Sequence, residues 1–129
     1  MPTYANPSSV TTSLSVREQL VICARKFDAL IVCDDVYDML QWQAPGSELS
    51  DRQDRAWLPR VVDVDRCLAG GTDRPGADGY GNVISNGSFS KICGPGCRLG
   101  WAESTPKTAK VLAERFVLHL LRCMYQSLT

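Results

Sequence analysis

The sequence predicts an α/β fold, namely a partial three-layer α/β/α domain with a mainly parallel sheet. Residues 15–28 repeat apolar side chains at helical spacing, and the continuous apolar run Ala29–Cys33 follows at once. Short apolar runs of this kind are typical of strands buried in parallel sheets. A helix that leads directly into such a strand is half of a βαβ unit. A second buried strand is predicted at Val83–Asn86, and 129 residues leave room for one small domain.

The first predicted helix begins at a capping box. Ser15 and Glu18 have the S-x-x-E spacing, in which each side chain bonds the backbone N–H of the other residue. Charged residues, among them Arg17, fall elsewhere around the helix from an apolar set near helical spacing, which consists of Val16, Leu20, Ala24 and Phe27. We expect the helix to end near Asp28, and residues 1–13, rich in Pro, Ser and Thr, to form a loop.

The spacing of apolar residues predicts secondary structure less clearly in the middle of the chain. Leu58–Val64 is interpreted as a short strand or an irregular segment, and the polar, glycine-rich stretch Ala69–Gly81 as a mobile surface loop. A third strand is predicted at Leu99–Ala102. The pair Thr105-Pro106 then indicates a helix start, with the threonine as N-cap and the proline at the first helical position. This helix is expected to continue to about Tyr125.

Composition excludes several classes of function. The formal net charge is zero, with 14 basic and 14 acidic residues, so neither nucleic-acid binding nor a basic membrane patch is predicted. No apolar run approaches the ~20 residues of a membrane helix. The N-terminus lacks the order of a signal peptide, so we expect a cytoplasmic location. The six cysteines show no C-x-x-C pair and there is one histidine, so no metal site is expected.

The run Ser88-Phe89-Ser90-Lys91 carries the strongest chemical signal. It follows a predicted strand and precedes a Gly-Pro-Gly turn, after which comes Arg98. A lysine placed in this way can form a Schiff base with a carbonyl when its surroundings favour the neutral amine. Serine hydroxyls and an arginine beside it can hold a phosphate. Together these residues indicate a site for a phosphorylated aldehyde cofactor, pyridoxal phosphate.

Two other motifs occur in order before that run. One is Asn6-Pro7, and the other is Asp34-x-x-Tyr37 at the end of a predicted strand. Asn-Pro, Asp-x-x-Tyr and Ser-x-Ser-Lys with a downstream Arg resemble the large domain of class I/II aminotransferases of fold type I. The resemblance covers roughly Pro2 to Lys107, the central part of that domain only. Residues 108–129 read as a divergent C-terminal helix.

The resemblance implies catalytic roles for three residues. Lys91 would form the Schiff base and, once displaced by substrate, shuttle a proton. Asp34 would keep the pyridine nitrogen protonated, so that the ring can absorb the electrons of a carbanion. Asp35 is a competing candidate for this role, but the spacing to Tyr37 favours Asp34. Tyr37, together with Asn6, would donate a hydrogen bond to the phenolic oxygen of the cofactor.

The same resemblance assigns the phosphate to Ser88, Ser90 and Arg98. One departure from the family pattern lies at Ser9, where the family usually has glycine after Asn-Pro-Thr or Asn-Pro-Ser. Glycine adopts a positive φ without strain and serine does not, so the local turn is in question.

The leading hypothesis is transfer of an amino group from an amino acid to a 2-oxo acid. The motifs are closest to the aminoadipate/kynurenine and aromatic branch, although related lyases share the same cofactor residues. The resemblance also implies a homodimer for the full-length protein. The stacking aromatic residue and the substrate-binding arginine of the family are not found, so we expect a truncated product. The alternative is a catalytically inactive fragment, or a regulatory domain that binds pyridoxal phosphate or another partner.

Overall fold

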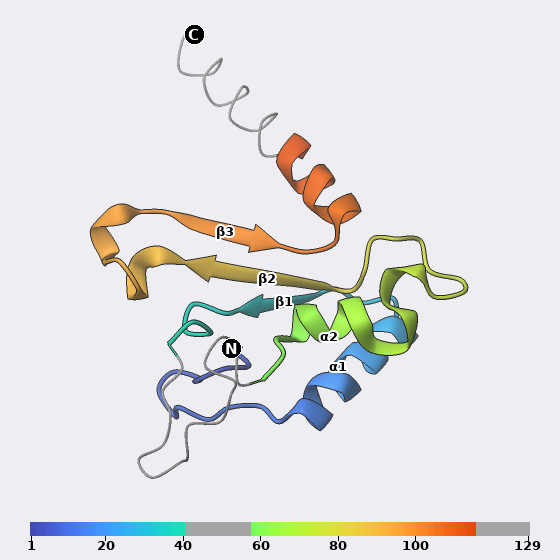
Figure 1. The fold of residues 1–129 in the computed structure, drawn as a ribbon, viewed down its shortest axis with the longest axis horizontal. Coiled ribbons are helices and arrows are strands. Elements are labelled where there is room, and N and C mark those ends of the chain that lie inside the picture. The colour runs from blue at the N-terminus through green and yellow to red at the C-terminus, as the bar shows by residue number, and fades with distance from the viewer. Residues whose placement is uncertain (41–57, 116–129) are drawn as a thin grey trace, which may run out of the picture.

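The computed structural model describes residues 1–40 and 58–115. In chain order the helices and strands are α1 (Leu14–Lys26), β1 (Ile31–Asp34), α2 (Val61–Cys67), β2 (Val83–Ser88) and β3 (Gly100–Glu103). Short 3₁₀ segments lie at η1 (Leu68–Asp73), η2 (Phe89–Lys91) and η3 (Pro95–Cys97). Residues 106–115 form a further helix, which extends beyond β3 in the view of Figure 1.

The strands form one mixed sheet in the order β1-β2-β3. β1 and β2 are parallel, with Ile31 opposite Val83, whereas β2 and β3 are antiparallel. The predicted α/β fragment and the approximate positions of its strands are therefore confirmed. β3 runs antiparallel because residues 89–99 form a reversing turn, and a parallel partner would need a crossover of about a dozen residues or more.

The first helix begins two residues earlier than predicted. Ser13 is its N-cap, and the Ser13 hydroxyl accepts a hydrogen bond from the backbone N–H of Val16 at 3.5 Å. The capping box predicted at Ser15 and Glu18 is therefore wrong. The C-terminal end lies where the sequence indicated it, since Phe27 caps the helix and Asp28 follows with a φ of 48°.

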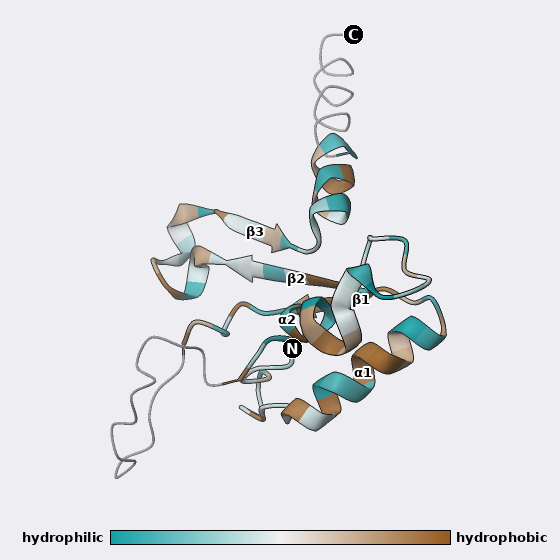
Figure 2. Ribbon diagram, turned by 45° about the vertical axis from the view of Figure 1, so that its right-hand side comes forward, coloured by the Kyte–Doolittle hydropathy of each residue, from teal (hydrophilic) through white to brown (hydrophobic). Residues whose placement is uncertain are grey.

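The apolar core lies between one face of the sheet and the two helices. Its buried members are Val21, Cys33, Val61, Val62, Val64 and Val83. Because alternate side chains point to opposite faces of a strand, Val32 lies on the other face of β1, where it is 65% exposed. Figure 2 shows that the hydrophobic half of β2 is the half beside α2, while the half toward the arrowhead is polar.

The helix α1 buries one member of the apolar set predicted for it, Ala24, which is 4% exposed. Val16, Leu20 and Phe27 are exposed, whereas Arg17 is fully buried beside Val21. The charged side chain can lie inside because backbone and hydroxyl oxygens accept its hydrogen bonds. The packing face of α1 is therefore rotated from the face that hydropathy alone predicts.

The segment predicted as Leu58–Val64, a short strand or irregular, is instead largely helix α2. The carboxylate of Asp63 accepts a hydrogen bond from the backbone N–H of Arg60, at 3.0 Å, and so satisfies one free donor at the helix start. Three valines of α2 enter the core. The stretch predicted as loop, Ala69–Gly81, begins inside η1 and otherwise forms turns.

The helix start predicted after β3 is confirmed. The hydroxyl of Thr105 accepts a hydrogen bond from the backbone N–H of Thr108 at 3.3 Å, and Pro106 is the first helical residue. The predicted continuation to Tyr125 lies outside the described residues. Within residues 1–40 and 58–115, no helix is long and apolar enough to cross a membrane.

Candidate cofactor site

The predicted site residues gather at the edge of the sheet where β1 and β2 end. Asp34 is the last residue of β1, and Ser88 is the last residue of β2. Because these strands are parallel, their carboxyl ends share one edge, which is where open α/β sheets bind ligands. Tyr37 follows β1 by three residues, and Lys91 follows β2 by three residues. Figure 1 shows the turn after β2 at this edge.

The turn that carries the lysine begins with two adjacent serine hydroxyls. The Ser88 hydroxyl accepts a hydrogen bond from the backbone N–H of Ser90 at 3.1 Å and donates to the Ser90 hydroxyl at 3.0 Å. The backbone N–H of Phe89 donates to the carbonyl of Leu99 at 3.1 Å, which closes the loop that leads to β3. Two hydroxyls on one tight turn can donate hydrogen bonds to an anion.

Lys91 lies against Tyr37. The Nζ atom of Lys91 is 5.8 Å from the centroid of the Tyr37 ring, within the range of a cation–π interaction. The lysine itself is exposed. This contact joins the segment after β1 to the segment after β2, so two residues 54 positions apart in the chain meet at one edge of the sheet.

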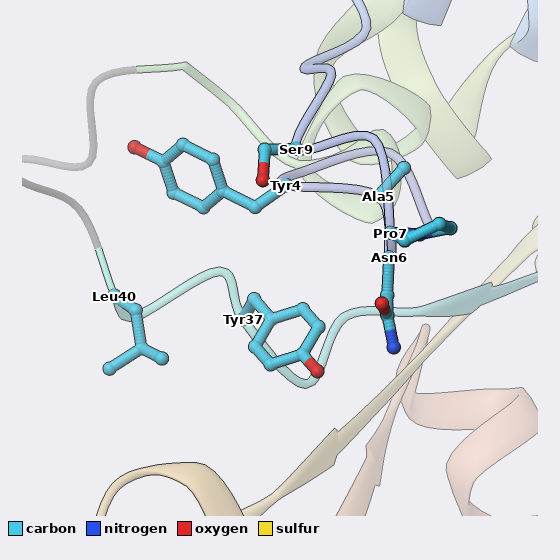
Figure 3. A pocket seen from close by; sticks show the side chains of 7 residues that line it. All are labelled: Tyr4, Ala5, Asn6, Pro7, Ser9, Tyr37 and Leu40. Atoms are coloured by element: carbon cyan, nitrogen blue, oxygen red, sulfur yellow. The ribbon is translucent and has the colours of Figure 1, made fainter.

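The N-terminal loop supplies the third part of the site. Asn6 and Tyr37 line a pocket of about 300 Å³, together with Tyr4, Ala5, Pro7, Ser9 and Leu40. Figure 3 shows the Asn6 amide and the Tyr37 hydroxyl side by side, pointing in the same direction. The Asn6–Pro7 peptide bond is cis. Ser9 has a φ of 57°. The serine therefore adopts the left-handed conformation that glycine, the usual residue of the family at this position, adopts without strain.

The two neighbouring aspartates have different environments. Asp34 is exposed at the end of β1, whereas Asp35 is 1% exposed and accepts a hydrogen bond from the Ser85 hydroxyl at 2.6 Å. Burial raises the pKa of the Asp35 carboxyl, and its Oδ1 atom has no hydrogen-bond partner among the described residues. Asp34 is thus open to solvent at the strand end, whereas Asp35 is a buried carboxyl with one oxygen left without a partner among the described residues.

Arg98 lies at the same end of the molecule, between η3 and β3. It has a φ of 49° and is exposed. Within the described ranges its guanidinium makes no hydrogen bond and no ion pair, so the structure does not place it against Ser88 or Lys91. Its five N–H donors remain available to an anion.

The turn around Lys91 is anchored by an aromatic pair that the sequence did not indicate. The rings of Phe89 and Trp101 have centroids 4.9 Å apart and are tilted by 60°. From its sequence alone, Trp101 reads as a core residue rather than a site residue. It is half-buried, and its indole lies over Gly87, where a Cβ atom would come within 2.2 Å of the ring.

Taken together, three pairs of predicted site residues meet: Asn6 with Tyr37, Tyr37 with Lys91, and Ser88 with Ser90. With the exposed carboxylate of Asp34 at the same edge, these residues offer an amine, hydroxyls, an amide and a carboxylate, which fits a phosphorylated aldehyde with an aromatic ring nitrogen. In the part of the chain that the structure describes, no group of three or more His, Cys, Asp or Glu could hold a metal ion.

Known proteins resemble this chain in sequence. No family model matches it. An uncharacterized protein of Saccharomyces cerevisiae is 44% identical over 104 residues, which cover 81% of this chain and 21% of the relative. An aromatic amino acid aminotransferase of Schizosaccharomyces pombe is 32% identical over 78% of the chain. The mitochondrial kynurenine/alpha-aminoadipate aminotransferase of Bos taurus is 29% identical over 93% of the chain, and 22% of that enzyme is covered.

Solved structures agree with these relatives. An archaeal alanine:glyoxylate aminotransferase matches 85% of the chain with a TM-score of 0.58 and 27% identity. A multiple substrate aminotransferase from Thermococcus profundus matches 84% with a TM-score of 0.56 and 30% identity. The chain spans 21% of the length of each of these enzymes. In sequence and in fold, the chain is therefore similar to a segment of the large domain of the fold-type I aminotransferases.

Proposed function

We propose that this chain is a pyridoxal-phosphate-binding domain of the aminotransferase type, with the cofactor held by Lys91. The observation that carries the proposal is the meeting of Asn6, Tyr37 and Lys91 at the carboxyl edge of the sheet. These residues come from three segments that are distant in sequence. We further propose that the domain spans residues 1–107, followed by a C-terminal helix that is not part of it.

When bound, pyridoxal phosphate supplies an aldehyde that reacts with amines and a ring that stores the electrons of a carbanion. Lys91 would hold the cofactor and, once released, would carry a proton to and from the reacting carbon. Asp34 would accept a hydrogen bond from the protonated ring nitrogen, since its carboxylate is exposed where the strand ends. Asp35 stays the alternative for that role, because its buried Oδ1 has no hydrogen-bond partner among the described residues and can accept a bond from the ring nitrogen.

Two further groups would orient the ring and its phosphate. The Tyr37 hydroxyl and the Asn6 amide point to the same side of their pocket, so both can donate to one phenolic oxygen. The hydroxyls of Ser88 and Ser90 would donate to phosphate oxygens. Arg98 would add a charge-assisted bond once its side chain turns toward them.

The reaction that we propose is transfer of an amino group from an amino acid to a 2-oxo acid. Several similar proteins are named as aromatic amino acid or kynurenine aminotransferases, so aromatic amino acids are the first donors to test. The assembly that we propose for the complete enzyme is a homodimer. Among residues 1–40 and 58–115 we assign none to the substrate carboxylate, so we expect slow turnover of this chain.

The test is direct detection of the cofactor on the purified chain. Pyridoxal phosphate is added, the absorbance band of the bound cofactor is recorded, and borohydride reduction followed by mass spectrometry locates the modified lysine. We expect modification at Lys91 and loss of the band in Lys91→Ala. The matched control is Lys110→Ala, which removes an exposed lysine from the helix of residues 106–115. An unchanged band in Lys91→Ala would refute the proposal.

A further inference from the structure

Arg17 is a fully buried cation near the start of α1. Its guanidinium donates four hydrogen bonds. Nε bonds the carbonyl of Thr12 at 2.8 Å and Nη1 bonds the carbonyl of Pro59 at 2.8 Å. Nη2 bonds both the carbonyl of Pro2 at 3.1 Å and the hydroxyl of Thr3 at 3.0 Å. One side chain therefore binds both legs of the N-terminal loop and the segment that enters α2.

The loop held in this way is the one that carries Asn6. Its legs are also joined by a hydrogen bond from the backbone N–H of Thr12 to the carbonyl of Pro2, at 2.8 Å. Farther along the loop, Ala5 and Val10 form an isolated β-bridge. Asn6 lies between these bridged residues, at the tip that faces Tyr37 (Figure 3). The contacts made by Arg17 thus lie at the base of the loop whose tip carries Asn6.

The charge of Arg17 is costly to bury. Burial lowers the pKa of its guanidinium, which the nearby carboxylate of Asp35 opposes. All four hydrogen-bond acceptors are neutral oxygens that diverge around the planar group. A lysine ammonium has three donors on one nitrogen and cannot reach acceptors spread over this fork. The site therefore requires the shape of arginine as well as its charge.

We propose that Arg17 is a positioning residue of the candidate cofactor site, which fixes the loop of residues 2–12 so that Asn6 stays beside Tyr37. Arg17 itself touches neither of these two residues in the described hydrogen bonds. Its effect on a cofactor rests on the function proposed above, whereas its effect on the loop does not.

The first test is amide hydrogen exchange on the full chain, with Arg17→Lys compared with Arg25→Lys. Arg25 is a matched control because it lies two turns farther along α1 and bonds Asp65 and the carbonyl of Leu68 instead of the loop. In Arg17→Lys we expect the amides of the loop to exchange roughly tenfold faster for each hydrogen bond lost, relative to those of the sheet. Arg25→Lys should leave the loop protected.

A milder variant, Thr3→Val, removes one acceptor of Arg17 and should produce the same pattern with a smaller amplitude. If Arg17→Lys does not fold, Thr3→Val alone tests whether Arg17 fixes the loop. Loop protection equal to that of the unmodified chain in Thr3→Val and in any folded Arg17→Lys would overturn the proposal. So would a uniform rise in exchange over the whole chain, because that would indicate a loss of global stability only.

The second test reports on the cofactor. Bound pyridoxal phosphate changes its absorbance with pH, and donors to its phenolic oxygen set the midpoint of that change. We expect the midpoint to shift in Thr3→Val in the same direction as in Asn6→Ala, and not in Arg25→Lys. If the unmodified chain binds no cofactor, the proposed function fails on its own test, while hydrogen exchange still decides whether Arg17 fixes the loop.

Discussion

Gly87→Ala tests whether the turn that carries Lys91 depends on the close approach of Trp101 to β2. Gly87 is buried, and it lies opposite Trp101 in the antiparallel pair of β2 and β3. A Cβ atom added at Gly87 would lie 2.2 Å from Cε2 and 2.3 Å from Cζ2 of the indole, where ordinary contacts begin at 3.4 Å. The ring would have to move by about 1 Å, because β2 itself is fixed by a strand on each side.

The expected loss of unfolding free energy in Gly87→Ala has two contributions. Overpacking by one methyl group typically costs about 1–3 kcal/mol. Displacement of the indole also weakens its contact with Phe89, and an aromatic pair of this geometry contributes about 0.5–1.5 kcal/mol. We therefore expect Gly87→Ala to lower the free energy of unfolding by about 2–4 kcal/mol, a large part of the ~5–15 kcal/mol of a small domain.

The assay is urea unfolding followed by far-ultraviolet circular dichroism. Gly96→Ala is the matched control, because a Cβ atom at Gly96 would meet nothing within 4 Å and the residue is not in the positive-φ region. Trp101→Ala provides the second arm of a double-mutant cycle. If the clash is the cause, Gly87→Ala should cost much less in the Trp101→Ala background. An equal cost in both backgrounds would refute the steric explanation.

Two further predictions concern the loop and the sheet. Ser9→Gly should raise the free energy of unfolding by about 0.5–1 kcal/mol, because relief of roughly 1–2 kcal/mol of left-handed strain exceeds the added chain entropy of glycine; a lower urea midpoint would contradict this. Hydrogen bonds from Arg60 and Arg66 hold the pKa of Glu103 below its ordinary value, so this carboxylate stabilises the fold above about pH 4.5 and ceases to do so as the pH falls through its lowered pKa. Glu103→Gln should therefore cost about 1 kcal/mol at pH 7, and this cost should fall as the pH is lowered through the pKa of Glu103, measured by urea unfolding over a series of pH values; a cost that does not change with pH would exclude the ion pairs as the cause.

The sequence predicts the strands and one helix cap well, because their causes are local. The apolar run ending at Cys33 becomes β1 within two residues of its predicted start, since a short buried strand needs no distant partner to be recognised. Thr105 caps its helix through a residue three positions away. The order of the cofactor motifs also indicates the edge of the sheet where Tyr37 and Lys91 meet, because ends of parallel strands lie together.

The predictions that were wrong, for Arg17 and for α2, depend on contacts between residues far apart in the sequence. Arg17 reads as a surface residue because its partner at Pro59 is 42 positions away, and a hydrogen bond to a carbonyl leaves no trace in the side-chain sequence. The valines of α2 read as strand formers because they are β-branched, yet they form a helix whose buried face is set by α1 and β2. Local propensity is outweighed in both places by contacts that only the folded chain brings together.

The arginines of this chain differ in whether the fold satisfies their hydrogen-bond donors, and this difference separates structural arginines from a candidate functional one. Five guanidiniums in the described part of the chain bond protein oxygens, from the fully buried Arg17 through the half-buried Arg25, Arg60 and Arg74 to the exposed Arg66. Arg98 differs, since no described residue accepts a hydrogen bond from it, and it stands at the same edge of the sheet as the exposed amine of Lys91. An arginine that stabilises the fold has its donors satisfied within the fold. The open donors of Arg98 are therefore consistent with the phosphate-binding role that we propose for it.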